Sequence, residues 1–243
     1  MSKEPTMKQL IKSIARPVLW YVGYMAAAMI AYAALYPFLG PWTELAAELG
    51  VQLTVAFATF RYLRRKQGTG KTVLKKRTST GIVLAFVLLG CVPTQLLVHA
   101  AGTASGFGTS NTATIIIGTL LVAPVLEEIA FRGVLFGMAR RRLGFWPATV
   151  FSAVMFQLAH DMGHLPATVP LALASAALYD ATGNLKYSIL LHLAFNWLSA
   201  VMYDVHVPVI LALPLYLAGL AAIVIGCARR KAVLGPSLVK SRG

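Results

Sequence analysis

Two adjacent carboxylates, Glu127 and Glu128, lie in an otherwise apolar stretch that has the length and composition of a membrane-spanning helix. Arg132 follows Glu128 by four residues, which places both side chains on one helix face where they can form an ion pair. Glu127 is rotated by about 100° from Glu128 on an α-helix and has no basic residue one turn away. Because ionisable side chains inside a membrane are energetically costly, they indicate a functional site. The pattern assigns the ion pair to Glu128 and the chemistry to Glu127.

Two later apolar stretches carry motifs with the same four-residue spacing. The first ends in Phe156-Gln-Leu-Ala-His160, and the second contains His192-Leu-Ala-Phe-Asn196. Each motif is predicted to place its two outer residues on one face of a helix. Hydrolysis of a peptide bond requires a general base that activates water and hydrogen-bond donors for the developing oxyanion. A glutamate with a histidine neighbour suits the first role, and an imidazole with a carboxamide suits the second.

The elements that position these residues are predicted to be membrane helices. Of the 243 residues, 58% are hydrophobic and 12% are charged, whereas about 25% of the residues of a soluble domain are charged. We therefore predict an all-α fold, a single polytopic membrane domain over residues 1–243 with about eight transmembrane helices. The candidate spans are 17–38, 43–62, 80–100, 113–138, 146–161, 166–182, 187–203 and 208–228. The fifth and sixth are shorter than the roughly 20 residues that cross a bilayer.

The basic residues predict how these helices are oriented. With eight spans, every lysine and arginine except Arg132 falls on one side: in the N-terminal segment, at 61–77, at 140–142, at Lys186 and from Arg229 onwards. Because positive residues stay on the cytoplasmic side, both termini are predicted to be cytoplasmic, in the plasma membrane. The first apolar stretch is longer than a signal-peptide core, which favours an uncleaved helix. The net charge of +14 then reflects topology and lipid headgroups, and no nucleic-acid partner is predicted.

Other candidate motifs are incomplete. Gly68-Thr-Gly-Lys-Thr72 lacks the first glycine of a phosphate-binding loop, because residue 65 is arginine. The sequence contains neither a His-Glu-x-x-His zinc motif nor a Gly-x-Ser-x-Gly nucleophile motif. Asp180 and Asp204 each follow a tyrosine, which resembles half of an intramembrane aspartyl protease site, but the Gly-x-Gly-Asp partner is missing. Both aspartates are interpreted as solvated residues near span ends.

The three polar motifs together resemble a known family. Glu-Glu-x-x-x-Arg at 127–132, Phe-x-x-x-His at 156–160 and His-x-x-x-Asn at 192–196 occur in this order, each on its own predicted span. This arrangement is similar to the CPBP family, the CAAX-processing and bacteriocin-processing intramembrane proteases, also called Abi proteins and related to the Rce1-type prenyl-protein endopeptidase. The run at 178–196 resembles the family's lead-in to its last motif. The resemblance covers a motif-bearing core at about 112–200.

The resemblance implies a role for each motif residue. Glu127 would be the catalytic base that activates water, assisted by His160. His192 and Asn196 would stabilise the oxyanion. The residues implied to support the site are Glu128, Arg132 and Phe156. The implied partners are the lipid bilayer and a membrane-associated peptide or protein substrate, which could be a lipidated C-terminal tail, a leader peptide or a small membrane peptide.

The resemblance also raises the question of a metal. Members of the family are often called metalloproteases, and Glu127, His160 and His192 would form a zinc ligand set of two histidines and one glutamate. The same residues can work without metal. Zinc as a cofactor therefore stays open.

Two functions from other classes remain as alternatives. A proton- or cation-coupled transporter also uses buried carboxylates and histidines, although such proteins usually show paired broken helices and internal symmetry, which this sequence lacks. A non-proteolytic immunity or scaffold protein could keep the fold without hydrolysis. Single residues also have structural interpretations, since an asparagine often bonds between membrane helices. The histidines interpreted as structural or interfacial are His99, His164 and His206. The oligomeric state is not predicted.

Overall fold

The computed structural model describes residues 7–39, 84–102 and 115–234 apart from 161, 203 and 206, together with isolated positions between 42 and 54. No strand occurs in these parts of the chain, so the predicted all-α fold is confirmed for them. The elements are α1 (Met7–Leu39), η2 (Val87–Cys91), α4 (Val92–Ala100), η3 (Ile115–Val122), α6 (Ala123–Glu127), η4 (Glu128–Phe136), α7 (Gly137–Leu143), α8 (Phe145–Gln157), η5 (Met162–His164), α9 (Leu165–Thr182), α10 (Leu185–Val201) and α11 (Val209–Leu234).

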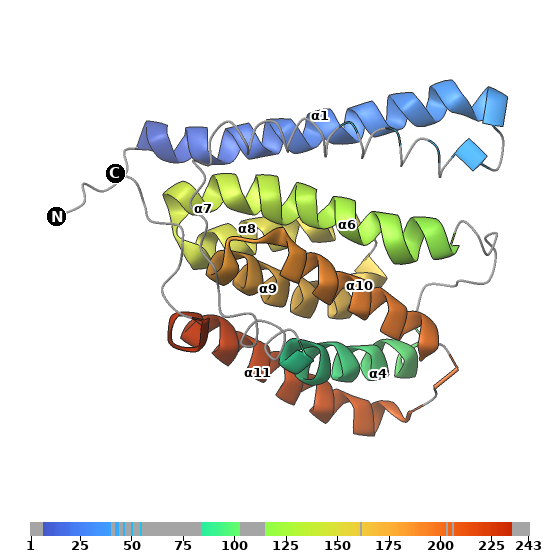
Figure 1. The fold of residues 1–243 in the computed structure, drawn as a ribbon, viewed down its shortest axis with the longest axis vertical. Helices are drawn as coiled ribbons and strands as arrows, with labels where there is room; N and C mark the ends of the chain where they lie inside the picture. Colours follow the sequence, from blue (N-terminus) through green and yellow to red (C-terminus); the bar gives the residue numbers. More distant parts are fainter. Residues whose placement is uncertain are drawn as a thin grey trace.

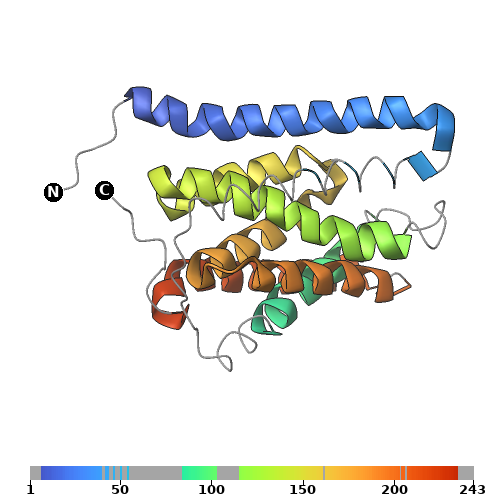
Figure 2. The ribbon, with the colours of Figure 1, turned by 45° about the horizontal axis from the view of Figure 1, so that its top comes forward.

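The helices form a bundle with the motif-bearing elements in its middle (Figure 1). The long helix α1 runs along one side and packs against α7 and η4. Helix α9 is the central element, in contact with α8, α10 and α11. On the side opposite α1, α4 packs against α11 (Figures 1 and 2). The elements that carry the predicted site are therefore covered by helices on both sides.

The helix with the two glutamates continues from Ile115 to Leu143, but it is not a regular α-helix. Two π-helical stretches, η3 and η4, flank the short α6 that begins just before Pro124. A proline inside a helix has no N–H to donate, and its ring crowds the carbonyl one turn earlier. The wider π turns around it absorb this mismatch, as π segments often do near functional sites. Pro124 thus lies between two changes of helical geometry.

The predicted spans agree with the described helices to different degrees. The last three spans match α9, α10 and α11 closely, while the fifth ends early, at Gln157. The second span, 43–62, lies almost wholly outside the described residues, as do the Gly68–Thr72 motif and the basic loop at 61–77. Among the described helices, two are long and apolar enough to cross a membrane, Val18–Leu39 and Val209–Arg229. The predicted count of about eight transmembrane helices is therefore not confirmed.

Most side chains of these two apolar helices are exposed and not buried in the protein. In an 18-residue window of each helix, only 6% of the residues within Val18–Leu39 and 17% of those within Val209–Arg229 are buried in the protein. The core helix of a soluble protein would be mostly buried, and a large apolar surface in water would drive association. On the two helices the exposed apolar residues include Leu19, Met29, Ile30, Phe38, Ile210 and Leu217. Such a surface matches a hydrocarbon environment.

Candidate active site

A buried ion pair anchors the centre of the bundle. Nη1 of Arg132 lies 3.3 Å from Oε1 of Glu128, and both side chains are completely buried. The predicted pairing of these two residues is therefore present, across a π turn. The same Oε1 atom lies 3.0 Å from Nδ1 of His192, which α10 brings in from 64 residues away. Since a carboxylate oxygen accepts hydrogen bonds, His192 donates from Nδ1.

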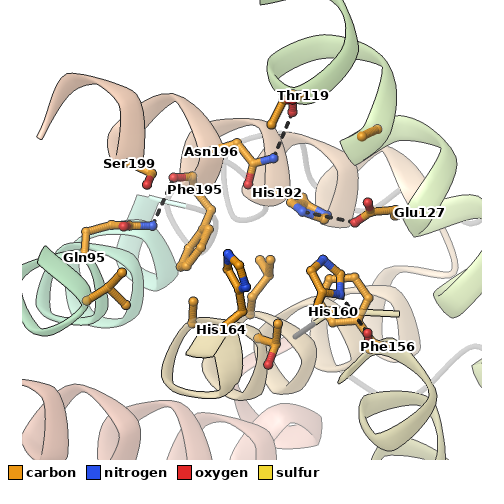
Figure 3. Close-up of a pocket in the computed structure, with 15 residues that line it drawn as sticks. Gln95, Thr119, Glu127, Phe156, His160, His164, His192, Phe195, Asn196 and Ser199 are labelled. Carbon is orange, nitrogen blue, oxygen red and sulfur yellow. Dashed lines mark hydrogen bonds and ion pairs between the residues drawn. The ribbon is translucent and has the colours of Figure 1, made fainter. Parts of the chain in front are cut away.

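His192 lies between the two neighbouring glutamates. Its second nitrogen, Nε2, is 3.7 Å from Oε2 of Glu127 (Figure 3). With the Nδ1 proton directed at Glu128, Nε2 of a neutral ring carries a lone pair that faces a carboxylate oxygen. One proton held on either group removes this repulsion. Sequence alone showed no cation one turn from Glu127; the structure supplies a histidine from α10, a contact that a linear motif cannot reveal.

The two glutamates differ in exposure as well as in partners. The side chain of Glu127 is 22% exposed, whereas that of Glu128 is fully buried. Glu127 is one of the residues that line a pocket. Glu128 instead holds an arginine and a histidine in place. The two carboxylates thus differ in burial and in contacts, and the predicted chemical role of Glu127 stays a prediction.

His160 lies beyond the helix on which it was predicted. Helix α8 ends at Gln157, and His160 follows in a turn. Its Nδ1 is 2.8 Å from the carbonyl oxygen of Phe156, so Nδ1 is the protonated nitrogen and Nε2 is the basic one in the neutral ring. Figure 3 shows that the other ring nitrogen points into the pocket. Phe156 and His160 are therefore in contact, but through the backbone carbonyl of Phe156 and not through side chains on one helix face.

Phe156 joins the charged cluster to the pocket through its ring. The Arg132 guanidinium carbon lies 4.6 Å from the ring centroid, a cation–π distance. The rings of His160 and His192 lie 4.6 Å and 5.8 Å from it, centroid to centroid. Phe156 is 1% exposed. Phe156 therefore contacts Arg132 and both imidazoles, and its supporting role stays a prediction.

Asn196 lies one turn after His192 on α10, as predicted, and bonds across to another helix. Its Nδ2 donates to the carbonyl oxygen of Thr119 at 3.0 Å. Thr119 belongs to the π-helical stretch η3. This bond uses one of the two protons on the amide nitrogen and fixes the orientation of the carboxamide.

All four residues predicted to be catalytic line one pocket, with a cavity volume of about 220 Å³. Figure 3 shows Glu127, His160, His192 and Asn196 around it. Phe156 lines it too, whereas Glu128 and Arg132 lie behind it. Polar residues that sequence reasoning did not assign to the site are Gln95, Thr119, Thr168, His164 and Ser199. They belong to no motif, and an isolated polar residue in an apolar helix gives no signal of what it faces.

The positions of Glu127, His160 and His192 bear on whether they could hold zinc. Among the described residues, no three side chains of His, Cys, Asp or Glu come together closely enough to hold a metal ion. Glu127, His160 and His192 share the pocket, but they do not converge on one point. Zinc therefore stays an open expectation, and the chemistry below uses the side chains alone.

Asp180 was interpreted as a solvated residue near a span end, and this interpretation is wrong. Its side chain is fully buried, and Oδ1 lies 2.6 Å from Nε of Arg140. The pair ties α7 to α9, since a buried carboxylate requires a partner. The two residues are 40 positions apart, which hides the contact from sequence. Asp204 is exposed, as expected, and Tyr203 lies outside the described residues.

Comparisons with known proteins bear on the same region. Residues 109–198 match the family model described as "Type II CAAX prenyl endopeptidase Rce1-like". Over 88 residues the chain is 34% identical to "Putative membrane peptidase YdiL" of Bacillus subtilis (strain 168), a match that spans 36% of each of the two chains. No solved structure matches at a significant level. The chain thus covers about a third of the length of this curated relative.

The family match contains all seven predicted site residues, and the outward apolar helices agree with a membrane location. The resemblance expected from the three motifs is therefore confirmed. Over residues 109–198 the chain is thus similar to the Rce1-like CAAX prenyl endopeptidases, and over a similar length to a membrane peptidase.

Proposed function

We propose that this protein is a membrane endopeptidase that hydrolyses a peptide bond of a membrane-associated peptide or protein. One observation carries the proposal: Glu127, His160, His192 and Asn196, from three separate parts of the chain, line a single pocket. The pocket holds a carboxylate, two imidazoles and a carboxamide. Hydrolysis of a peptide bond requires a general base that activates water and hydrogen-bond donors that stabilise the oxyanion.

Glu127 is the general base in this proposal. It takes a proton from a water molecule, and the resulting hydroxide attacks the carbonyl carbon of the scissile bond. The proton on Glu127 then passes to the amine nitrogen as the C–N bond breaks, which gives a carboxylic acid and an amine. His160 assists through Nε2, because its Nδ1 proton is held by the Phe156 carbonyl.

His192 and Asn196 serve the tetrahedral oxyanion. When His192 carries the second proton, Nε2 becomes a donor while Nδ1 stays bonded to Glu128. Asn196 contributes the amide proton that does not bond to Thr119. Such donors stabilise the transition state most when they are fixed in advance. The Glu128–Arg132 pair and the Phe156 ring supply this fixation.

The test is cleavage by the purified full-length protein in proteoliposomes. The probes are internally quenched peptides: a farnesylated CAAX tail, a double-glycine leader peptide and a short apolar membrane peptide. We expect cleavage of at least one, and loss of cleavage in Glu127→Gln but not in Asp204→Asn, a matched change at an exposed carboxylate. Cleavage that persists in Glu127→Gln overturns the mechanism. Zinc content and activity after chelation decide the metal dependence.

The cytoplasmic placement of the termini, in the plasma membrane, is also part of the proposal. Figures 1 and 2 draw the start of α1, the α7–α8 and α9–α10 junctions and the end of α11 at the same end of the bundle. Arg140, Arg141, Arg142 and Lys186 lie at these junctions, and basic residues favour the cytoplasmic side. Maleimide labelling in intact cells should reach Asp204→Cys but not Arg142→Cys. The reverse pattern would invert the topology.

A further inference from the structure

The end of the pocket away from Glu127 contains a buried carboxamide that the proposed hydrolysis does not use. Gln95 lies in α4, outside the residues that match the Rce1-like family, and is 1% exposed. Its Nε2 donates to the carbonyl oxygen of Phe195 at 3.4 Å. Because a carbonyl oxygen only accepts, this contact identifies which end of the carboxamide carries the nitrogen. The other end, Oε1, is thus an acceptor.

Oε1 of Gln95 is buried and has no hydrogen-bond partner among the described residues. Gln95 also lines the pocket. A buried acceptor is destabilising unless something supplies a donor. Figure 3 shows Gln95 on one side of the pocket, beside Phe195 and Ser199, with Glu127 on the other. Because Oε1 is buried, a ligand that reaches across the pocket from Glu127 supplies that donor when the carboxamide turns toward it.

The surroundings of Gln95 indicate what kind of donor fits. Val98, Phe195 and Leu171 give this pocket apolar walls. Gln95 itself is neutral, and a charged ammonium group would lose its hydration there without a counter-charge. A backbone N–H is a neutral donor, and every peptide substrate carries several. The neighbouring substrate side chain would then be apolar.

We propose that Gln95 is a substrate-positioning residue, whose Oε1 accepts a hydrogen bond from one backbone N–H of the peptide substrate. An apolar side chain of the substrate packs against Val98 and Phe195 beside this bond. The proposal rests on the proposed function, because it takes the occupant of the pocket to be a peptide. Gln95 holds the substrate without touching the reacting atoms, so its loss should raise KM and leave kcat nearly unchanged.

The experiment measures binding without turnover. A fluorescein-labelled farnesylated CAAX octapeptide is titrated against the full-length Glu127→Gln protein in detergent micelles, with and without the additional change Gln95→Met. We expect Kd to rise about five- to tenfold with Gln95→Met, the usual effect of one lost neutral hydrogen bond. A peptide series with each backbone N–H methylated in turn should weaken binding strongly at one position only, and Gln95→Met should remove that penalty.

Thr94 provides the matched control. It is the preceding residue of α4 and is equally buried, but it does not line the pocket, and its hydroxyl donates to the carbonyl of Gly90. Thr94→Val should leave Kd and the methylation profile unchanged. Should Gln95→Met not fold, Gln95→Glu replaces it: this variant keeps an acceptor oxygen, so the penalty must persist at the same position.

An unchanged Kd in Gln95→Met, no binding to the Glu127→Gln protein, or a methylation penalty that ignores residue 95 overturns the proposal. These results are separate from the fate of the proposed function. Absence of cleavage by the unmodified protein would overturn the hydrolysis, while the binding data would still show whether Gln95 holds a peptide.

Discussion

The centre of the bundle and its outer helices reverse the pattern of a soluble protein. In the centre, Glu128 and Arg132 are completely buried, and His192 is 3% exposed. On the outer helices, Met29 of α1 is 71% exposed and Ile210 of α11 is 79% exposed. In water, charged residues are almost never fully buried without a partner, and large apolar patches mark contact surfaces. Both regions make sense if the exterior meets hydrocarbon.

The contrast explains why the central charges carry information. A charged residue in an apolar surrounding is unfavourable, and it persists where partners compensate it. Glu128 has such partners in Arg132 and His192. Glu127 stands next to it and faces the pocket with a 22% exposed side chain. One carboxylate is buried against an arginine and a histidine, and its neighbour faces the pocket.

The largest effect is expected at Glu127. The change Glu127→Gln keeps the size of the side chain and removes the base, so kcat should fall by about 10²–10⁴-fold, the usual contribution of general base catalysis. The unfolding temperature in detergent should stay close to that of the unmodified protein. Turnover of the best peptide probe and thermal unfolding, measured on one preparation, check both parts. A large drop in stability would show that Glu127, like Glu128, maintains the centre.

Glu128→Ala should affect folding first. It leaves the Arg132 guanidinium fully buried without its carboxylate, and breaking such a pair destabilises a protein by about 3–5 kcal/mol. The yield of folded protein from membranes and the midpoint of thermal unfolding should both fall. Asp204→Asn, at an exposed carboxylate, should change neither. If Glu128→Ala unfolded like the parent, the centre would not depend on this ion pair.

Asn196→Ala should lower activity with less effect on stability. Removal of one oxyanion donor reduces kcat by about 10²–10³-fold in well-studied hydrolases, whereas the bond to the Thr119 carbonyl contributes only about 0.5–1.5 kcal/mol. Asn196→Asp keeps the size but replaces the donor with an acceptor, so it should not restore turnover. Equal loss of activity and folded protein in Asn196→Ala would assign the residue to helix packing.

Local contacts in the centre could be predicted from sequence. The Glu128–Arg132 pair and the His192–Asn196 spacing lie within one turn, and helical geometry alone places each pair together. His160 shows where this reasoning stops. Because α8 ends at Gln157, His160 lies in a turn and not on the predicted helix face. Its Nδ1 contacts the backbone carbonyl of Phe156. Helix ends depend on tertiary surroundings that a periodic pattern does not contain.

Contacts between distant residues could not be predicted. Arg140 and Asp180 are 40 positions apart, and each looked like an ordinary residue near a span end. Gln95 belongs to no motif, yet it faces the same pocket as Glu127. The family resemblance supplied the link between Glu127, His160 and His192, and the packing of α9 and α10 supplied the rest. Only the fold shows which isolated polar residues meet.

The outer helices yield the smallest expected effect and test the other half of the comparison. Leu217 lies near the middle of the Val209–Arg229 segment and is 54% exposed. If this face meets hydrocarbon, Leu217→Lys should reduce membrane insertion by about 2.5–3.5 kcal/mol, seen as less carbonate-resistant protein. Leu217→Ala should have little effect, because the site is exposed and no cavity forms. A face that meets water would tolerate the lysine. Full insertion of Leu217→Lys would therefore leave the buried charges of the centre without an apolar exterior to explain them.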